Sequence, residues 1–259
     1  MTNDTRTKHP FGVKVGSKLG NYFKYVFSLG AIGLMVSIAS GFVITHILTS
    51  FLSFHNIWIT FAICSIFYII ADVVLSFTVF SPNSIVNNST EKSMLFFGIS
   101  CILNGMRVVP MYLISYAIGF SSLINAFVAT VLVFTTISIF VIKSKNDFSS
   151  NNAMMTTIAY AGLTVAFVLF LVKLVCFYIN PMIFAAIDII SSLIGILIST
   201  IMLSMNIGDI KDTYAKFYNN DTILVRLGIV GAIRLIQEFF TILWYVFKLL
   251  LYSRKNNNE

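Results

Sequence analysis

Long apolar runs without a charged side chain constrain this chain more than any other feature. Residues 27–53 and 121–142 contain no Asp, Glu, Lys or Arg, and each run exceeds the about 20 residues that a helix needs to cross a bilayer. Only 10% of the 259 residues are charged, whereas an ordinary soluble domain carries about 25%. The sequence therefore excludes a soluble globular enzyme and predicts a polytopic membrane protein.

Polar clusters divide the apolar sequence into seven candidate spans, and the longest polar break is expected at 206–226. The runs are apolar on all sides rather than at every second residue, which favours helices over a barrel. We expect an all-α membrane protein with a tail at 1–26, a seven-helix domain at 27–251 and a tail at 252–259. The predicted spans are 27–53, 57–80, 94–117, 121–142, 154–178, 182–205 and 227–251.

The distribution of basic residues predicts the orientation of the chain. With a cytoplasmic N-terminus, the loops after the first, third and fifth spans hold no Lys or Arg; only Arg254 and Lys255 disagree. We expect a multi-pass protein of a cell inner (plasma) membrane, with the bilayer rather than nucleic acid as partner. The basic residues placed inside are Arg6, Lys8, Lys14, Lys18, Lys24, Lys92, Lys143, Lys145, Lys211 and Lys216.

The first span is open to a second interpretation as a secretory signal. Basic residues precede it, and Ser37 to Ser40 resembles a small-residue cleavage site. The apolar run continues for about a dozen residues beyond that point, which favours a retained span.

Six ionisable side chains lie well inside the predicted spans, and their signs balance three to three. Each costs roughly 2.5–3.5 kcal/mol at a helix centre, so they need partners or water. Lys173 and Asp188 lie about equally far from the turn at Pro181, which predicts an ion pair between two antiparallel helices. Arg234 and Glu238 are four residues apart, which permits a bridge within the last helix. The six are Asp72, Arg107, Lys173, Asp188, Arg234 and Glu238.

Sequence motifs of enzymes are missing from the chain. The sequence contains neither HExxH nor GxSxG, and His9, His46 and His55 form no cluster along it. The cysteines, at 64, 101 and 176, lie within apolar runs without CxxC spacing and are expected to be packing residues. We expect no enzymatic activity and no cofactor, and the sequence does not identify a metal site.

Two stretches near the end of the chain carry a family resemblance. The stretch from Gly195 to Tyr214, GILISTIMLSMNIGDIKDTY, and the stretch from Ala232 to Lys248, AIRLIQEFFTILWYVFK, resemble the sixth and seventh helices of the Bax inhibitor-1-like (transmembrane Bax inhibitor motif) family. In register, the family's helix 7 Asp falls on Glu238 and its helix 6 Asp on Asn206. Pro110 within the third span is also similar to the family.

The resemblance implies a fold and a function. It implies a central seventh helix wrapped by the other six, and a pH-sensitive calcium leak in which two facing carboxylates share a proton. The departure at Asn206 leaves one titrating group of that pair, so the proton switch is not expected to carry over unless Asp209, one turn further, replaces it. The implied pore or gating residues are Glu238, Asn206, Asp209, Arg234 and Thr241, with Ca²⁺ as the permeant ion.

Two other functions stay open at this point. A small-solute transporter would use the intramembrane charges as coupling sites, but an internal repeat is not evident. A non-conducting regulatory membrane protein would use the same charges to hold its helices together. A measurement of calcium flux into proteoliposomes distinguishes these two functions from that of a leak channel.

Overall fold

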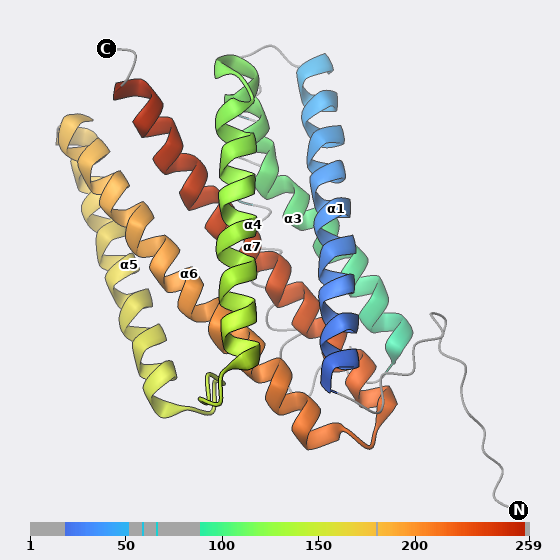
Figure 1. The fold of residues 1–259 in the computed structure, drawn as a ribbon. Coiled ribbons are helices and arrows are strands. Elements are labelled where there is room, and N and C mark those ends of the chain that lie inside the picture. Colours follow the sequence, from blue (N-terminus) through green and yellow to red (C-terminus); the bar gives the residue numbers. More distant parts are fainter. Residues whose placement is uncertain (1–18, 52–58, 60–65, 67–88, 180, 257–259) are drawn as a thin grey trace, which may run out of the picture.

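The computed structural model describes residues 19–51, 59, 66, 89–179 and 181–256. All elements within these residues are α-helices, and the labels here follow Figure 1. The expected span at 57–80 lies, apart from residues 59 and 66, outside the described residues, and Asp72 lies outside with it. The helices are α1 (Leu19–Phe51), α3 (Thr90–Ile118), α4 (Ser121–Lys143), α5 (Ala153–Ile179), α6 (Pro181–Phe217) and α7 (Asp221–Asn256).

The helices α3, α4 and α5 coincide closely with predicted spans, whereas α6 and α7 both extend into the predicted polar break at 206–226. The helix α6 continues to Phe217 and α7 begins at Asp221. A helix that leaves the hydrocarbon layer can continue in water with polar side chains on its surface, so polarity alone does not end it. The side chain of Asn220 accepts a hydrogen bond from the N–H of Ile223 at 3.1 Å and so caps the new helix.

The helix α7 packs against α1, α3, α4 and α6, while α5 packs against α6 at the edge of the bundle (Figure 1). Apolar side chains of α7 dominate the core. Cys101 of α3 is also buried there, as the sequence predicted. The fully buried α7 residues include Ile229, Ile236, Phe240, Ile242 and Phe247.

Small residues bring α1 and α3 into backbone contact. A Cβ atom at Gly41 would lie 2.6 Å from the carbonyl oxygen of Gly105, and one at Gly105 would lie 2.7 Å from the carbonyl oxygen of Ser37. Small residues at a helix crossing permit this close approach, which is typical of helices packed inside a membrane. The pair α1 and α3 therefore forms one tightly joined wall beside α7.

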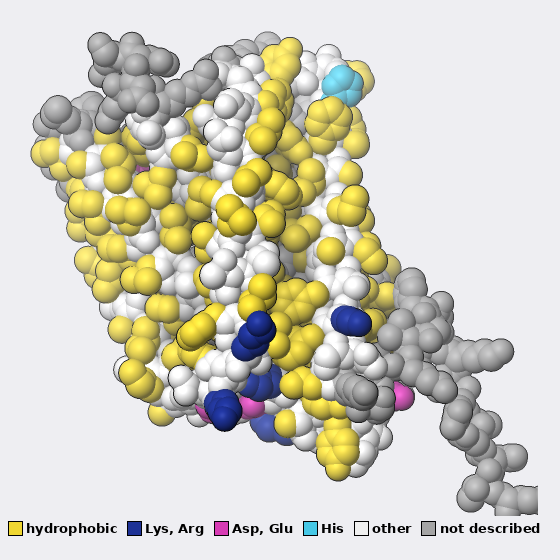
Figure 2. Space-filling view, in the orientation of Figure 1, with side chains coloured by type: hydrophobic (Ala, Val, Ile, Leu, Met, Phe, Trp, Pro, Cys, Tyr) yellow, Lys and Arg dark blue, Asp and Glu magenta, His cyan; other side chains and the backbone are white. Residues whose placement is uncertain are grey.

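The outer surface of the bundle is apolar. Large hydrophobic side chains on α1, α4 and α5 are exposed, among them Met35, Leu132 and Phe167, and Figure 2 shows hydrophobic side chains over most of the visible height of the helices. Such a continuous patch is unfavourable in water and expected in lipid. Five of the described helices, α1, α3, α4, α5 and α6, are long and apolar enough to cross a membrane.

Lys and Arg side chains gather at the lower end of the visible face in Figure 2. We call this the basic end: α1 and α7 begin here, and α4 and α6 end here. Its residues include Lys24, Lys143, Lys145, Lys211 and Lys216.

Candidate functional site

Polar side chains form one stripe along α7. They follow each other at intervals of four and three residues, which places them on a single face of a helix. Each is partly accessible, whereas most of the apolar residues between Arg234 and Leu243 are buried. From first to last the stripe extends for about 27 Å at 1.5 Å per residue, close to the hydrocarbon thickness of a bilayer. The polar stripe consists of Arg234, Glu238, Thr241, Tyr245, Lys248 and Tyr252.

Arg234 begins the stripe near the basic end and forms an ion pair with α6. Its Nη1 lies 3.4 Å from Oδ2 of Asp209, and both side chains are partly buried. Asp209 also accepts hydrogen bonds from the backbone N–H of Ser150 at 2.7 Å and from its hydroxyl at 2.8 Å. The carboxylate therefore joins α7, α6 and the loop between α4 and α5.

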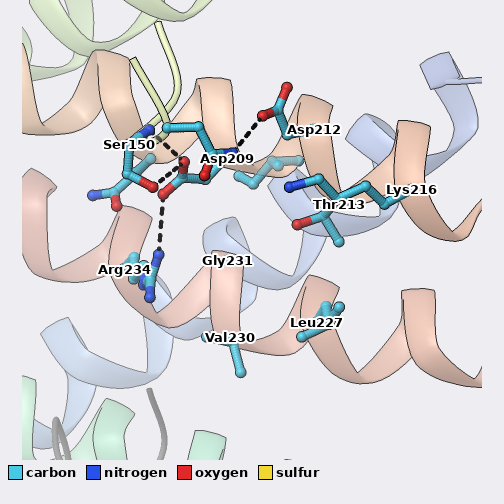
Figure 3. Close-up of a pocket in the computed structure, with 12 residues that line it drawn as sticks. Ser150, Asp209, Asp212, Thr213, Lys216, Leu227, Val230, Gly231 and Arg234 are labelled. Atoms are coloured by element: carbon cyan, nitrogen blue, oxygen red, sulfur yellow. Dashed lines mark hydrogen bonds and ion pairs between the residues drawn. The ribbon is translucent and has the colours of Figure 1, made fainter. Parts of the chain in front are cut away.

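A polar cavity of about 250 Å³ surrounds this ion pair (Figure 3). Asn206, Asp209 and Asp212 of α6 line one side, and Gly231 and Arg234 of α7 line the other. Opposite charges and amide oxygens face the same space, so the cavity offers ligands for cations as well as donors for water. Within the described part of the chain, no three His, Cys, Asp or Glu residues come together to hold a metal ion.

The loop at 144–152 closes over one side of this cavity. The Nδ2 of Asn151 donates to Asp212 at 3.0 Å, and Nζ of Lys211 donates to the carbonyl oxygen of Ser144 at 2.8 Å. The loop lies directly on the backbone of α6, where a Cβ atom at Gly208 would be 2.6 Å from the carbonyl carbon of Phe148. Gly208 therefore lets the loop bring Ser150 to Asp209.

The middle of the stripe faces α3. Nη1 of Arg107 donates to the hydroxyl of Thr241 and to the carbonyl oxygen of Gln237, both at 3.3 Å. The cation on α3 thus reaches α7 at Gln237 and Thr241, which precede and follow Glu238 in the chain, an arrangement that the sequence alone did not predict.

The far end of the stripe holds a second ion pair with α6. Nζ of Lys248 lies 2.6 Å from Oδ1 of Asp188, and the hydroxyl of Tyr252 donates to Oδ2 at 2.9 Å. The Asp188 side chain is only 4% exposed. Between the two ion pairs, the ring of Tyr245 packs on Gly195, where a Cβ atom would overlap it.

The structure brings together some of the predicted site residues. Asn206 lines the same cavity as Asp209 and Arg234, but Glu238 is not among the described residues that line it. Arg234 is paired with Asp209 on α6, so the bridge from Arg234 to Glu238 stays a prediction. The pair of Lys173 with Asp188 also stays a prediction, because the Lys173 side chain lies outside the described residues.

Sequence reasoning missed Lys248, Tyr252 and the Ser150 loop. A signal for Lys248 was present, because it lies about as far beyond the turn at 218–220 as Asp188 lies before it, so antiparallel packing puts the two at one depth. The loop contacts had no such signal, since Ser150 is far from Asp209 in sequence and no pattern links them.

A family model described as "Inhibitor of apoptosis-promoting Bax1" matches residues 19–256. The match runs from the first residue of α1 to the last residue of α7. No curated protein matches the chain.

Proposed function

The chain belongs to the Bax inhibitor family, and on that premise we propose that it is a multi-pass membrane protein that lets cations, calcium among them, leak across the bilayer. In this proposal its N-terminus is cytoplasmic and its membrane is the cell inner (plasma) membrane. Residues 57–80 supply the second helix in chain order. This helix, together with α1, α3, α4, α5 and α6, wraps around α7.

The polar stripe on α7 is the observation that carries the proposal. Ionisable groups at membrane depth are costly, and they face the protein interior or a water-filled path. Here three charged residues, Arg234, Glu238 and Lys248, repeat along one partly accessible face for nearly the thickness of the hydrocarbon layer. Ion pairs that only join helices would not need a continuous row with Thr241 and Tyr245 between them.

Glu238 is the carboxylate that attracts the cation in this proposal. It lies one turn beyond Arg234 in the stripe, and α6 and α7 run antiparallel with Asp209 opposite Arg234. That register brings Asn206, one turn before Asp209, to the depth of Glu238, one turn after Arg234. An amide oxygen and a carboxylate are oxygen ligands of the kind that calcium prefers.

The ion pair between Asp209 and Arg234 closes the path at the basic end. The guanidinium of Arg234 lines the cavity and repels a permeant cation. The loop at 144–152 holds Asp209 in place through Ser150. Loss of the Asp209 charge removes the ion pair with Arg234 and weakens the hydrogen bonds from Ser150, so the closed arrangement becomes less stable.

Calcium flux into proteoliposomes that contain the full-length protein tests the proposal. We expect Glu238→Gln to reduce the flux at least tenfold and Asp209→Asn to raise it, while the control Glu91→Gln, at an exposed acidic residue of α3, leaves it unchanged. A flux equal to that of protein-free liposomes would support the non-conducting alternative. Equal flux in the wild type and both site variants would refute the assignment of Glu238 and Asp209.

A further inference from the structure

An apolar groove lies between α1 and α4, away from the polar stripe. Its cavity has a volume of about 120 Å³ and is lined by Phe27 and Gly30 of α1, Phe134 of α4, and Leu235 and Ile236 of α7. Among the residues that the structure describes, no polar side chain lines it. Ala31, at its margin, is exposed on the surface of the bundle. The groove therefore leads from the outer face of α1 to the side of α7.

Gly30 creates the space in this groove. A Cβ atom at this position would meet nothing within 4 Å, although the residue itself is buried. The rings of Phe27 and Phe134, with centroids 6.4 Å apart, bridge α1 and α4 beside it. Water gains nothing in a cavity without polar partners, whereas hydrocarbon restores the dispersion contacts that an empty cavity lacks.

Two lysines lie at the basic end of the same two helices. Lys24 precedes Phe27 by about one turn, and Lys143 follows Phe134 by about 13 Å along α4 at 1.5 Å per residue. Both side chains are exposed. Figure 2 shows Lys and Arg side chains below the hydrophobic surface of α1 and α4 at this end. An apolar groove that ends at two cations is complementary to a lipid with an anionic headgroup.

We propose that this groove binds one acyl chain of an anionic phospholipid from the surrounding bilayer, and that Lys24 and Lys143 hold its headgroup phosphate. The acyl chain lies along Gly30, beside the contact of Phe27 with Phe134, and reaches Leu235 and Ile236. The lipid is thereby in contact with α7 at Leu235 and Ile236, on a different face of the helix from the polar stripe.

Two other occupants fit the groove less well. A helix from a second copy has a diameter of about 10 Å with its side chains. Such a helix cannot enter the groove, whose cavity has a volume of only about 120 Å³. The segment at 1–18 carries four basic residues against one acidic residue, so Lys24 and Lys143 repel it. Charge complementarity therefore favours an anionic lipid.

Photo-crosslinking of the full-length protein in vesicles tests the location. The probe is phosphatidylglycerol with a diazirine in one acyl chain, and its control is phosphatidylcholine with the same chains. We expect phosphatidylglycerol adducts on residues 27–34 and on Phe134, at least fivefold more than from phosphatidylcholine. Equal labelling by both lipids, adducts elsewhere on the bundle, or crosslinks between two copies at Phe134 would overturn the proposal.

Matched variants separate the chain contact from the headgroup contact, with retained phosphatidylglycerol measured by native mass spectrometry. Gly30→Leu fills the groove and is expected to lower retention at least tenfold, whereas Gly98→Leu, also in open space but on α3, retains the lipid. Each lysine near an anionic surface contributes about a fivefold change in binding. The double variant Lys24→Gln with Lys143→Gln is therefore expected to bind about 25-fold more weakly.

Lys92→Gln is the control for the lysine variant, because Lys92 is exposed at the start of α3. Wild-type retention in Gly30→Leu would overturn the acyl-chain site. A lysine double variant that loses no more lipid than Lys92→Gln would overturn the headgroup site. If Gly30→Leu does not fold, the crosslinking of the wild type still decides the location.

Discussion

Removal of the Lys248 charge should destabilise the bundle more than removal of any exposed charge. Lys248 lies 2.6 Å from Asp188, and their side chains are 16% and 4% exposed. The variant Lys248→Gln shortens the side chain by one atom and takes away the cation that α7 places beside the Asp188 carboxylate. Breaking one side of such a buried pair typically costs about 3–5 kcal/mol.

The hydrogen bond from Tyr252 limits the loss. Its hydroxyl still donates to Oδ2 of Asp188 at 2.9 Å in the variant, and a hydrogen bond to a charged group is worth about 1.5–3 kcal/mol. We therefore expect a loss near the lower limit, about 3 kcal/mol. The double variant Lys248→Gln with Asp188→Asn carries no unpaired charge at this site and should recover about half of that loss or more.

The free energy of unfolding can be measured by titration with sodium dodecyl sulfate in mixed micelles, followed by intrinsic fluorescence. Lys92→Gln serves as the exposed control and should change stability by less than about 0.5 kcal/mol. Lys173→Gln, measured in parallel, tests the pair predicted from the sequence. A loss below about 1 kcal/mol in Lys248→Gln, or a double variant as unstable as the sum of its single variants, would refute this reasoning.

Two further predictions concern the loop at 144–152. Gly208→Ala should displace the loop from α6, because its Cβ atom would lie 2.6 Å from the backbone of Phe148; labelling of Ser150→Cys by a water-soluble maleimide should then become faster, and unchanged labelling would contradict the close approach. Hydrogen bonding from Ser149, whose N–H donates to Oδ1 at 2.8 Å, lowers the pKa of Asp147. The ionised form therefore stabilises the loop above the ordinary Asp pKa of about 3.9, and this stabilisation is lost as the pH falls below it. Amide exchange at 147–152, corrected for intrinsic rates, should be faster at pH 3 than at pH 6, and Asp147→Asn should remove that difference.

The apolar sequence was sufficient to predict the helical class and most helix positions. A backbone in hydrocarbon must satisfy its own hydrogen bonds, so a run such as 121–142 has little alternative to a helix, and α4 occupies Ser121–Lys143. The same constraint ends at the membrane surface, where water also satisfies the backbone. For that reason the sequence predicted only a broad polar break at 206–226, and the position of the turn within it depends on Asn220 and its local cap.

Only the tertiary structure decided which partners the charges have. The sequence shows that Arg234, Glu238 and Asp188 need partners, because isolated charges are costly in a membrane. It favours neighbours along one helix or across one short turn, yet Arg234 is paired with Asp209 and Asp188 with Lys248. These pairs arise from the register in which α6 and α7 pack, and that register is set by many contacts at once, including Tyr245 against Gly195. No local pattern contains that information.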